Sequence, residues 1–311
     1  MFNWFNKKQG KPGLVGINYS GQVLSLAHVV PGDEPVLNQC EEHVVESESE
    51  LLHVLSKLVQ ELGLEGARAT YVLSPNDYQL LLVEAPPNVE GEELNAAIKW
   101  KIRDLVDQPV EELAVTVFPV PDDAYRGDQA MVYAVASSKG RIQKIVDLIA
   151  EAGLRLEFID IPELVYKNLT EIYADDSNGL AFLDLRGSGS VMNICKQDAL
   201  YLTRHLNTKL DQDIVSSNDW HTTKERLSLE VQRSLDYYES QMGQVTIPRI
   251  LIAPRKQDSR EVAEQLNTEL AVNVEYMNLA EKLASHVELS LGVQHTCLLA
   301  IGGALRQDKA A

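Results

Sequence analysis

Residues 14–30 read LVGINYSGQVLSLAHVV, and they decide the fold when set beside residues 179–196, which read GLAFLDLRGSGSVMNICK. Each stretch is an apolar run, a turn rich in small residues, and a second apolar run, which is the pattern of a β-hairpin. Asn18 and Asp184 occupy matching positions at the two turns. The sequence therefore predicts two equivalent hairpins, one in each half of the chain.

The order of elements after each hairpin is also the same. Residues 36–45 predict a third strand in the first unit, and residues 200–205 predict one in the second. A strand closes each unit, at residues 70–74 and 250–252. An amphipathic helix precedes each closing strand, with apolar stripes at Leu51, Leu55, Leu58 and Leu62 and at Leu227, Val231 and Leu235. Two tandem units of this kind indicate an internal duplication, so we predict an α/β fold whose halves face each other across a cleft.

An inserted α+β module separates the two units. Its expected elements are a helix at 89–107, strands at 113–120 and 131–136, a helix at 138–152 and, beyond the module, a helix at 161–172. The domain organisation that we predict is a terminal segment 1–12, a first half 13–155 and a second half 156–311. Within the first half, the core covers 13–85 and the inserted subdomain covers 86–155.

Charge and composition exclude several functional classes. The 311 residues carry a formal net charge of -18, from 46 acidic and 28 basic side chains. Nucleic-acid binding needs basic surface that displaces counterions, so we predict no nucleic-acid partner. The chain has no apolar run near the roughly 20 residues that span a bilayer, and its start does not read as a signal peptide. We therefore predict a cytoplasmic protein.

Cysteines and histidines show no metal-site pattern. Cys40, Cys195 and Cys297 match no zinc or redox spacing, and the seven histidines are scattered. Gly-x-Ser-x-Gly and Walker motifs are absent as well. The sequence therefore predicts no metal and no catalytic residues, and it predicts a protein that is not an enzyme.

Several phrases resemble the PilM family, the actin-like proteins of type IV pilus assembly in the actin/Hsp70/hexokinase (ASKHA) superfamily. They follow in a consistent order along the chain: AAIKW at 96–100 with VDQP at 106–109, EAGL at 151–154 with IDI at 159–161, EVQRSLDYY at 230–238, and AIGGALR at 300–306. Among PilM relatives, the likeness is greatest to the MshI proteins of mannose-sensitive haemagglutinin (MSHA) pilus assembly.

The resemblance implies a fold, a location and a partner. It implies the duplicated βββαβα actin-like fold, with the inserted subdomain in the first half. PilM lies under the inner membrane and binds the cytoplasmic N-terminal tail of PilN, a single-pass membrane protein, in a groove between the inserted subdomain and the first core subdomain. For this chain it implies an adaptor that contacts a PilN-like tail and other inner-membrane platform proteins, with only indirect membrane association.

The resemblance also implies where a nucleotide would bind. In actin-fold ATPases two hairpin turns of the form Asp-x-Gly hold the phosphates and Mg²⁺, because glycine allows close backbone approach. Asn18 replaces the aspartate in the first turn, and Ser20 replaces the glycine, although Gly21 follows. A plain hairpin turn explains these residues as well, since asparagine and glycine favour turns.

The second turn is better preserved than the first. Asp184 is present, Arg186 stands at the glycine position, and Gly187 and Gly189 follow. Either residual phosphate binding or turn chemistry accounts for this pattern. Cofactor-binding candidates are therefore Asn18, Ser20, Gly21, Asp184, Gly187 and Gly189, in a degenerate site.

The adenosine loop departs most from the family pattern of a strand followed by Gly-Gly. The strand at 250–252 continues into Ala253 and Pro254, where a Cβ atom and a proline ring replace bare backbone. Gly302 and Gly303 lie instead in the phrase that resembles the last helix. We predict no cofactor. The alternative is an actin-like protein that binds ATP and Mg²⁺ weakly and switches or forms filaments with nucleotide.

Trp100 is the candidate partner-binding residue. The helix around it carries an apolar stripe formed by Leu94, Ala97, Ile98, Ile102 and Leu105. Trp100 lies about 200° from Ile98 on a helix of ~3.6 residues per turn, so it faces away from the stripe. It either packs against a neighbouring subdomain or lines a groove for a peptide. The acidic runs 41–42, 46–50 and 90–93 are either a solvated surface or a site that attracts a basic tail.

Overall fold

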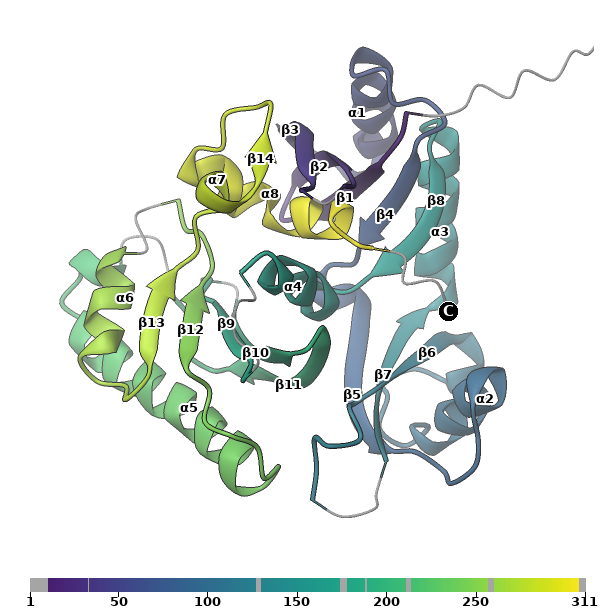
Figure 1. Ribbon diagram of the computed structural model, residues 1–311. Coiled ribbons are helices and arrows are strands. Elements are labelled where there is room, and N and C mark those ends of the chain that lie inside the picture. Colours follow the sequence, from purple (N-terminus) through teal and green to yellow (C-terminus); the bar gives the residue numbers. More distant parts are fainter. Residues whose placement is uncertain are drawn as a thin grey trace, which may run out of the picture.

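The computed structural model describes residues 11–32, 34–126, 130–173, 178–187, 189–210, 214–256 and 260–307. Two large sheets and one small sheet are connected by helices (Figure 1). The first ten residues of the predicted terminal segment, and Ser188 in the second turn, lie outside the described residues.

The first sheet has the strand order β14-β3-β2-β1-β4-β8. Its strands are β1 (Leu14–Ser20), β2 (Val23–Val30), β3 (Val36–Val44), β4 (Arg68–Val72), β8 (Arg155–Asp160) and β14 (Ala284–Ser285). Strand β1 pairs antiparallel with β2 and parallel with β4, and β8 extends the parallel part. Strand β1, in the interior of this sheet, is almost wholly buried, which explains its continuous apolar run.

The second sheet repeats this arrangement and confirms the predicted duplication. Its strand order is β11-β10-β9-β12-β13. The strands are β9 (Leu180–Asp184), β10 (Ser190–Lys196), β11 (Ala199–Leu206), β12 (Arg249–Ile252) and β13 (Asn273–Tyr276). Strand β9 pairs antiparallel with β10 and parallel with β12, as β1 does with β2 and β4.

Helices form the outer and middle layers around the two sheets (Figure 1). Their bounds are α1 (Glu48–Glu61), α3 (Lys139–Glu151), α4 (Pro162–Glu171), α5 (Trp220–Ser240), α6 (Arg260–Asn267), α7 (Leu279–Lys282) and α8 (Leu291–Ala304). Helices α1 and α3 share a core with the outer face of the first sheet, and α5 and α6 with that of the second. Helices α4 and α8 lie between the sheets in a third core that both halves share.

The middle layer depends on glycines where backbones meet. A Cβ atom at Gly16 of β1 would lie 1.9 Å from the carbonyl oxygen of Ala300 in α8. On the same helix, a Cβ at Gly303 would lie 2.8 Å from Val72, and one at Gly302 would lie 2.5 Å from Val165 of α4. The Gly-Gly pair therefore lies in the last helix, as predicted, and the structure shows that it allows close helix packing there.

The inserted subdomain starts earlier and ends earlier than the predicted range 86–155. Its sheet has the order β5-β7-β6, with β5 (Tyr78–Glu84), β6 (Leu113–Pro119) and β7 (Met131–Ser138). Helix α2 (Gly91–Lys101) covers it. Helix α3 packs instead in the core of the first half, through Ile145 and Ile149. The difference arises because β5 pairs only with distant β7, which local periodicity cannot show.

Helix α2 is shorter than the helix predicted at 89–107. It ends at Lys101, and the chain turns before Pro109. Leu105 therefore leaves the predicted apolar stripe and is 57% exposed, whereas Ile98 and Ile102 are fully buried against the small sheet.

We expect Gly16→Ala to lower the free energy of unfolding by about 3 kcal/mol, because its methyl group would overlap the backbone of α8. Gly292→Ala is the matched control in α8, since its Cβ would meet only the Ser290 hydroxyl at 3.8 Å. It should leave stability unchanged or slightly raised. Urea denaturation measures both, and equal stabilities of the two variants would contradict the proposed role of Gly16.

Candidate functional site

A cleft of about 250 Å³ lies between the two halves and contains both predicted turns. Asn18 and Ser20 line it from the first half, and Asp184 and Gly189 line it from the second. Tyr166 of α4 also reaches this cleft. The structure thus brings together four of the six predicted cofactor-binding residues, whereas Gly21 and Gly187 are not among the lining residues.

The side chain of Asn18 is committed to the fold. Its Nδ2 donates a hydrogen bond of 2.9 Å to the carbonyl oxygen of Val72, so the amide ties β1 to β4. Ser25 Oγ donates to the Asn18 carbonyl at 3.4 Å. Asn18 is 5% exposed, and it brings no negative charge toward the cleft. This contact matches the interpretation of a structural hairpin turn.

The carboxylate of Asp184 is paired with an arginine and a tyrosine of the chain itself. Tyr166 donates its hydroxyl to Asp184 Oδ2 at 2.5 Å, and Arg186 Nε lies 2.8 and 2.9 Å from the two carboxylate oxygens. Arg186 also donates to the His295 carbonyl at 3.3 Å. Burial opposes the charged guanidinium, but Asp184 outweighs this effect, so the pKa of Arg186 lies above its ordinary value. The Arg186 charge is therefore permanent and paired.

These contacts do not suit a magnesium–nucleotide complex. The carboxylate that would face Mg²⁺ accepts bonds from Tyr166 and Arg186, and the matching Asn18 carries no charge. Among the described residues, no cluster of three or more His, Cys, Asp or Glu side chains could hold a metal ion. Since Mg²⁺ beside a nucleotide is usually held through one or two carboxylates together with phosphates and water, the residues of the two turns do not fit it.

The loop after β12, residues 253–255, is packed tightly against other parts of the chain. Ala253 is fully buried, and its N–H donates to the Leu183 carbonyl at 2.9 Å. Arg255 is 2% exposed and donates to the Leu185 carbonyl at 2.9 Å. His295 Nδ1 lies 3.0 Å from the Pro254 carbonyl oxygen. Burial, with the charge of Arg186, lowers the pKa of His295 to about 4, so this imidazole is neutral at pH 7 and donates to Pro254.

Glu163 is a cleft residue that the sequence analysis missed. This carboxylate at the start of α4 is 1% exposed and accepts a hydrogen bond of 2.7 Å from the Tyr78 hydroxyl. His205 Nε2 lies 3.8 Å from its other oxygen. Burial raises the pKa of Glu163, and the bond from Tyr78 opposes that shift. In the sequence, Pro162-Glu163 reads as an ordinary helix start, so no local signal distinguishes this carboxylate.

The connection between β6 and β7 joins the inserted subdomain to the second half. We call residues 120–126 the bridging loop, and its Val120 and Ala124 are buried in the core of the second half. Asp123 Oδ1 accepts a hydrogen bond of 2.7 Å from the Tyr201 hydroxyl. From β7, the Tyr133 hydroxyl accepts from the Thr203 N–H at 3.2 Å. The inserted subdomain therefore contacts both halves.

A second cavity is an apolar groove of about 390 Å³ between the inserted subdomain on one side and α3, β8 and the start of α4 on the other. Ala114, Thr116 and Phe118 of β6 line one side, and Ile142 and Leu164 line the other. Most of the other lining side chains are aliphatic, so the groove presents little charge. Such a concave apolar surface fits an extended or helical peptide.

One ion pair stands at the edge of the groove. Arg306 Nη1 lies 2.7 Å from Asp160 Oδ2, and its guanidinium lies over the Phe158 ring at 4.1 Å from the centroid. Burial raises the pKa of Asp160, and Arg306 opposes the shift. The pair adds no net charge when both groups are ionised.

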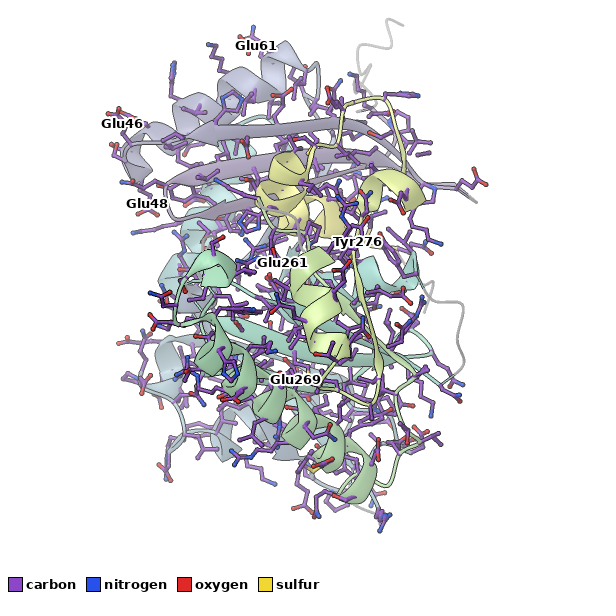
Figure 2. All side chains as sticks on the ribbon, turned by 90° about the vertical axis from the view of Figure 1, so that its left-hand side faces the viewer. Glu46, Glu48, Glu61, Glu261, Glu269 and Tyr276 are labelled. Atoms are coloured by element: carbon purple, nitrogen blue, oxygen red, sulfur yellow. The ribbon has the colours of Figure 1, made fainter. Side chains whose placement is uncertain are left out.

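Trp100 is 60% exposed on α2, opposite the fully buried Ile98, as the helical spacing predicted. The alternative that Trp100 packs against a neighbouring subdomain is wrong. Trp100 is not among the residues that line the groove, so its role in partner binding stays a prediction. The glutamates of the acidic runs are mostly exposed, and Figure 2 shows Glu46, Glu48 and Glu61 on the surface at and beside α1.

Comparison of the whole chain with solved structures identifies the fold. The structure described as the PilM-PilN type IV pilus biogenesis complex superimposes with a TM-score of 0.72 and 18% identity, over 94% of this chain and 98% of that chain. A protein of Bacteroides thetaiotaomicron with an actin-like ATPase fold and unknown function gives a TM-score of 0.52 and 11% identity, over 95% and 98%. The chain has an actin-like fold.

Sequence comparison adds no relative. No protein-family model and no curated protein matches the chain. Within the described residues, no helix is long and apolar enough to cross a membrane.

We expect Arg186→Gln to lower the free energy of unfolding by roughly 2 kcal/mol, because the 5% exposed carboxylate of Asp184 loses its counter-charge. The double variant Asp184→Asn/Arg186→Gln should recover most of this loss, since it removes both charges. Guanidinium denaturation of the two single variants and the double variant measures this coupling.

Arg103→Gln is the control, because the Arg103–Asp104 pair is exposed and should contribute nothing measurable. If the Arg186 and Asp184 substitutions are simply additive, the proposed pairing in the cleft is not a coupled unit.

Proposed function

We propose that this chain is a non-catalytic adaptor of type IV pilus assembly, of the MSHA (MshI) type, and that it binds the cytoplasmic N-terminal tail of a PilN-like single-pass protein. The observation that carries the proposal is the apolar groove between the inserted subdomain and the wall formed by α3, β8 and α4. Similarity of fold to the protein in the PilM-PilN complex supports it. PilM binds its partner in a groove at the same place, as the family resemblance implies.

The groove and the net charge of the chain suit a tail that has an apolar part and a basic part. Apolar side chains of the tail would be buried against Phe118, Ile142 and Leu164, which releases water and supplies affinity. Basic residues next to the membrane would face an acidic protein of net charge -18. Lys and Arg are the residues enriched on the cytoplasmic side of single-pass proteins, so the charges are complementary.

The proposal places the chain at the cytoplasmic face of the inner membrane, with indirect membrane association. The partner's transmembrane segment would hold it there, and further platform proteins would contact other faces. Two observations support an adaptor that works without nucleotide turnover. Asp184 is already paired with Arg186, and the loop at Ala253 and Pro254 is already packed against the rest of the chain.

We expect N-terminal peptides of PilN-like pilus proteins to bind the wild-type chain, and Ala114→Arg to weaken binding at least about tenfold by filling the groove. Ala280→Arg is the matched control, because the same substitution then lies on exposed α7 of the second half. Trp100→Ala should also weaken binding if the tail continues onto α2. Fluorescence anisotropy with labelled peptides measures the affinities, and circular dichroism confirms that each variant is folded.

The outcomes separate the site from the function. If Ala114→Arg weakens binding no more than the control Ala280→Arg does, the tail binds elsewhere. Binding that depends on Trp100 but not on Ala114 would transfer the site from the groove to α2. Failure of all such peptides to bind would overturn the adaptor proposal.

The second candidate is an ATP-binding actin-like protein that switches or forms filaments. Asp184 and Gly189 favour it, because they still line a cleft between the two halves. We expect calorimetry with Mg-ATP to give no low-micromolar binding, since Arg186 and Tyr166 already satisfy Asp184. Sedimentation with and without ATP should give equal pelleting. Micromolar binding or ATP-dependent pelleting would favour the second candidate over the nucleotide-independent adaptor.

A further inference from the structure

Two of the three cysteines meet between the first sheet and the last helix. In the register of β3 and β2, Cys40 is paired with Ala27, and Ala27 belongs to the core that the first sheet shares with α8. Cys297 of α8 lies in the same core, and Cys40 packs against that core. The Cys297 Sγ donates to the carbonyl oxygen of Glu41, the residue after Cys40, at 3.6 Å. The two thiols are therefore neighbours although their positions in the sequence are far apart.

The two thiols differ in access to solvent. Cys297 is fully buried, whereas Cys40 in β3 is partly exposed. Hydrogen bonding to Cys40, followed by burial, raises the pKa of Cys297 well above the ordinary value of a thiol. Cys297 therefore stays protonated at pH 7, and Cys40 is the thiol that a reagent in solution meets first.

We propose that Cys40 and Cys297 are a thiol pair that forms a reversible disulfide between β3 and α8 when glutathione becomes oxidised. The Cys40 thiolate attacks one sulfur of glutathione disulfide, and the first glutathione leaves as a thiolate. Cys297 loses its proton to water or buffer base and attacks the Cys40 sulfur, and the second glutathione leaves. Two protein thiols are oxidised to one disulfide, while one glutathione disulfide is reduced to two glutathione molecules.

The second step sets the rate of this reaction. Because the thiolate is the attacking form and Cys297 is a buried, protonated thiol, its attack should be slow at pH 7 and faster at higher pH. The Cys40–glutathione mixed disulfide should therefore appear transiently before the intramolecular bond.

The bond would link β3 covalently to α8. Strand β3 belongs to the first half, and α8 reaches the first sheet from the far end of the chain. A crosslink between such distant positions closes a long loop and restricts the unfolded chain. The oxidised protein should therefore melt at a higher temperature than the reduced protein. This inference does not rest on the adaptor function.

Cys195 provides an internal control. It lies in β10 of the second half, is buried, and contacts Thr170 and Lys167 rather than another thiol. Burial raises the pKa of Cys195 to about 12, and the bond from Thr170 opposes the shift. We therefore expect it to stay reduced while the protein is folded.

The test is incubation of the folded chain with glutathione disulfide, followed by intact mass measurement and then by alkylation of the remaining thiols. Wild type and Cys195→Ser should both lose the mass of two hydrogens, and peptide mapping should identify the link between Cys40 and Cys297. Cys297→Ser should stop at the mixed disulfide, and Cys40→Ser should not react. Dithiothreitol should reverse the mass change and the rise in melting temperature.

Three results would overturn the proposal. In the first, wild type accumulates the mixed disulfide without closing it at any pH. In the second, the link involves Cys195. In the third, no thiol is consumed although circular dichroism and complete alkylation after unfolding show a native, reduced starting protein.

Discussion

The structure depends on the close contact between β1 and α8, where no side chain separates the two backbones. Gly16 faces the carbonyl of Ala300, and Gly303 approaches Val72 of the neighbouring strand. A side chain at either position would push α8 off the first sheet. Because α8 follows the last strands of the second half but packs on the first sheet, this contact holds the two halves together.

Helix α4 joins the two halves in the opposite direction, from the first sheet to the second. Side chains of α4 line both the cleft and the groove. Helix α4 follows β8 of the first sheet and contacts β9, β10 and β11 of the second. Tyr166 of α4 and the backbone of His295 in α8 bond to Asp184 and Arg186 in the cleft. Leu164 lines the groove from α4. The halves are thus joined by protein contacts across the cleft.

The two cavities differ in chemistry, and that difference underlies the proposed function. In the cleft, Asp184, Arg186 and Glu163 already have partners within the chain, so a ligand would have to compete with them. The groove beside β6 offers an apolar surface with one ion pair at its edge, and burying that surface is favourable without displacing existing bonds. The bridging loop fixes the inserted subdomain that forms one side of the groove.

The sequence by itself determined the duplicated hairpins and the class of fold. Alternating and continuous apolar runs around turn residues are local signals, so the two hairpins at 14–30 and 179–196 were predicted close to their true bounds. The replacement of the expected aspartate by Asn18, and of Gly-Gly by Ala253 and Pro254, was also readable without a structure. These features depend on residues that are neighbours in the chain.

Only the tertiary structure decided which distant residues meet. Strands β5, β8, β13 and β14 were missed, because their pairing partners lie outside any local window. The same reason hid the buried position of Glu163, the pairing of Asp184 with Tyr166, and the meeting of Cys40 with Cys297. Periodicity records which face of an element is apolar, but packing of one element on another sets which side chains come together on that face.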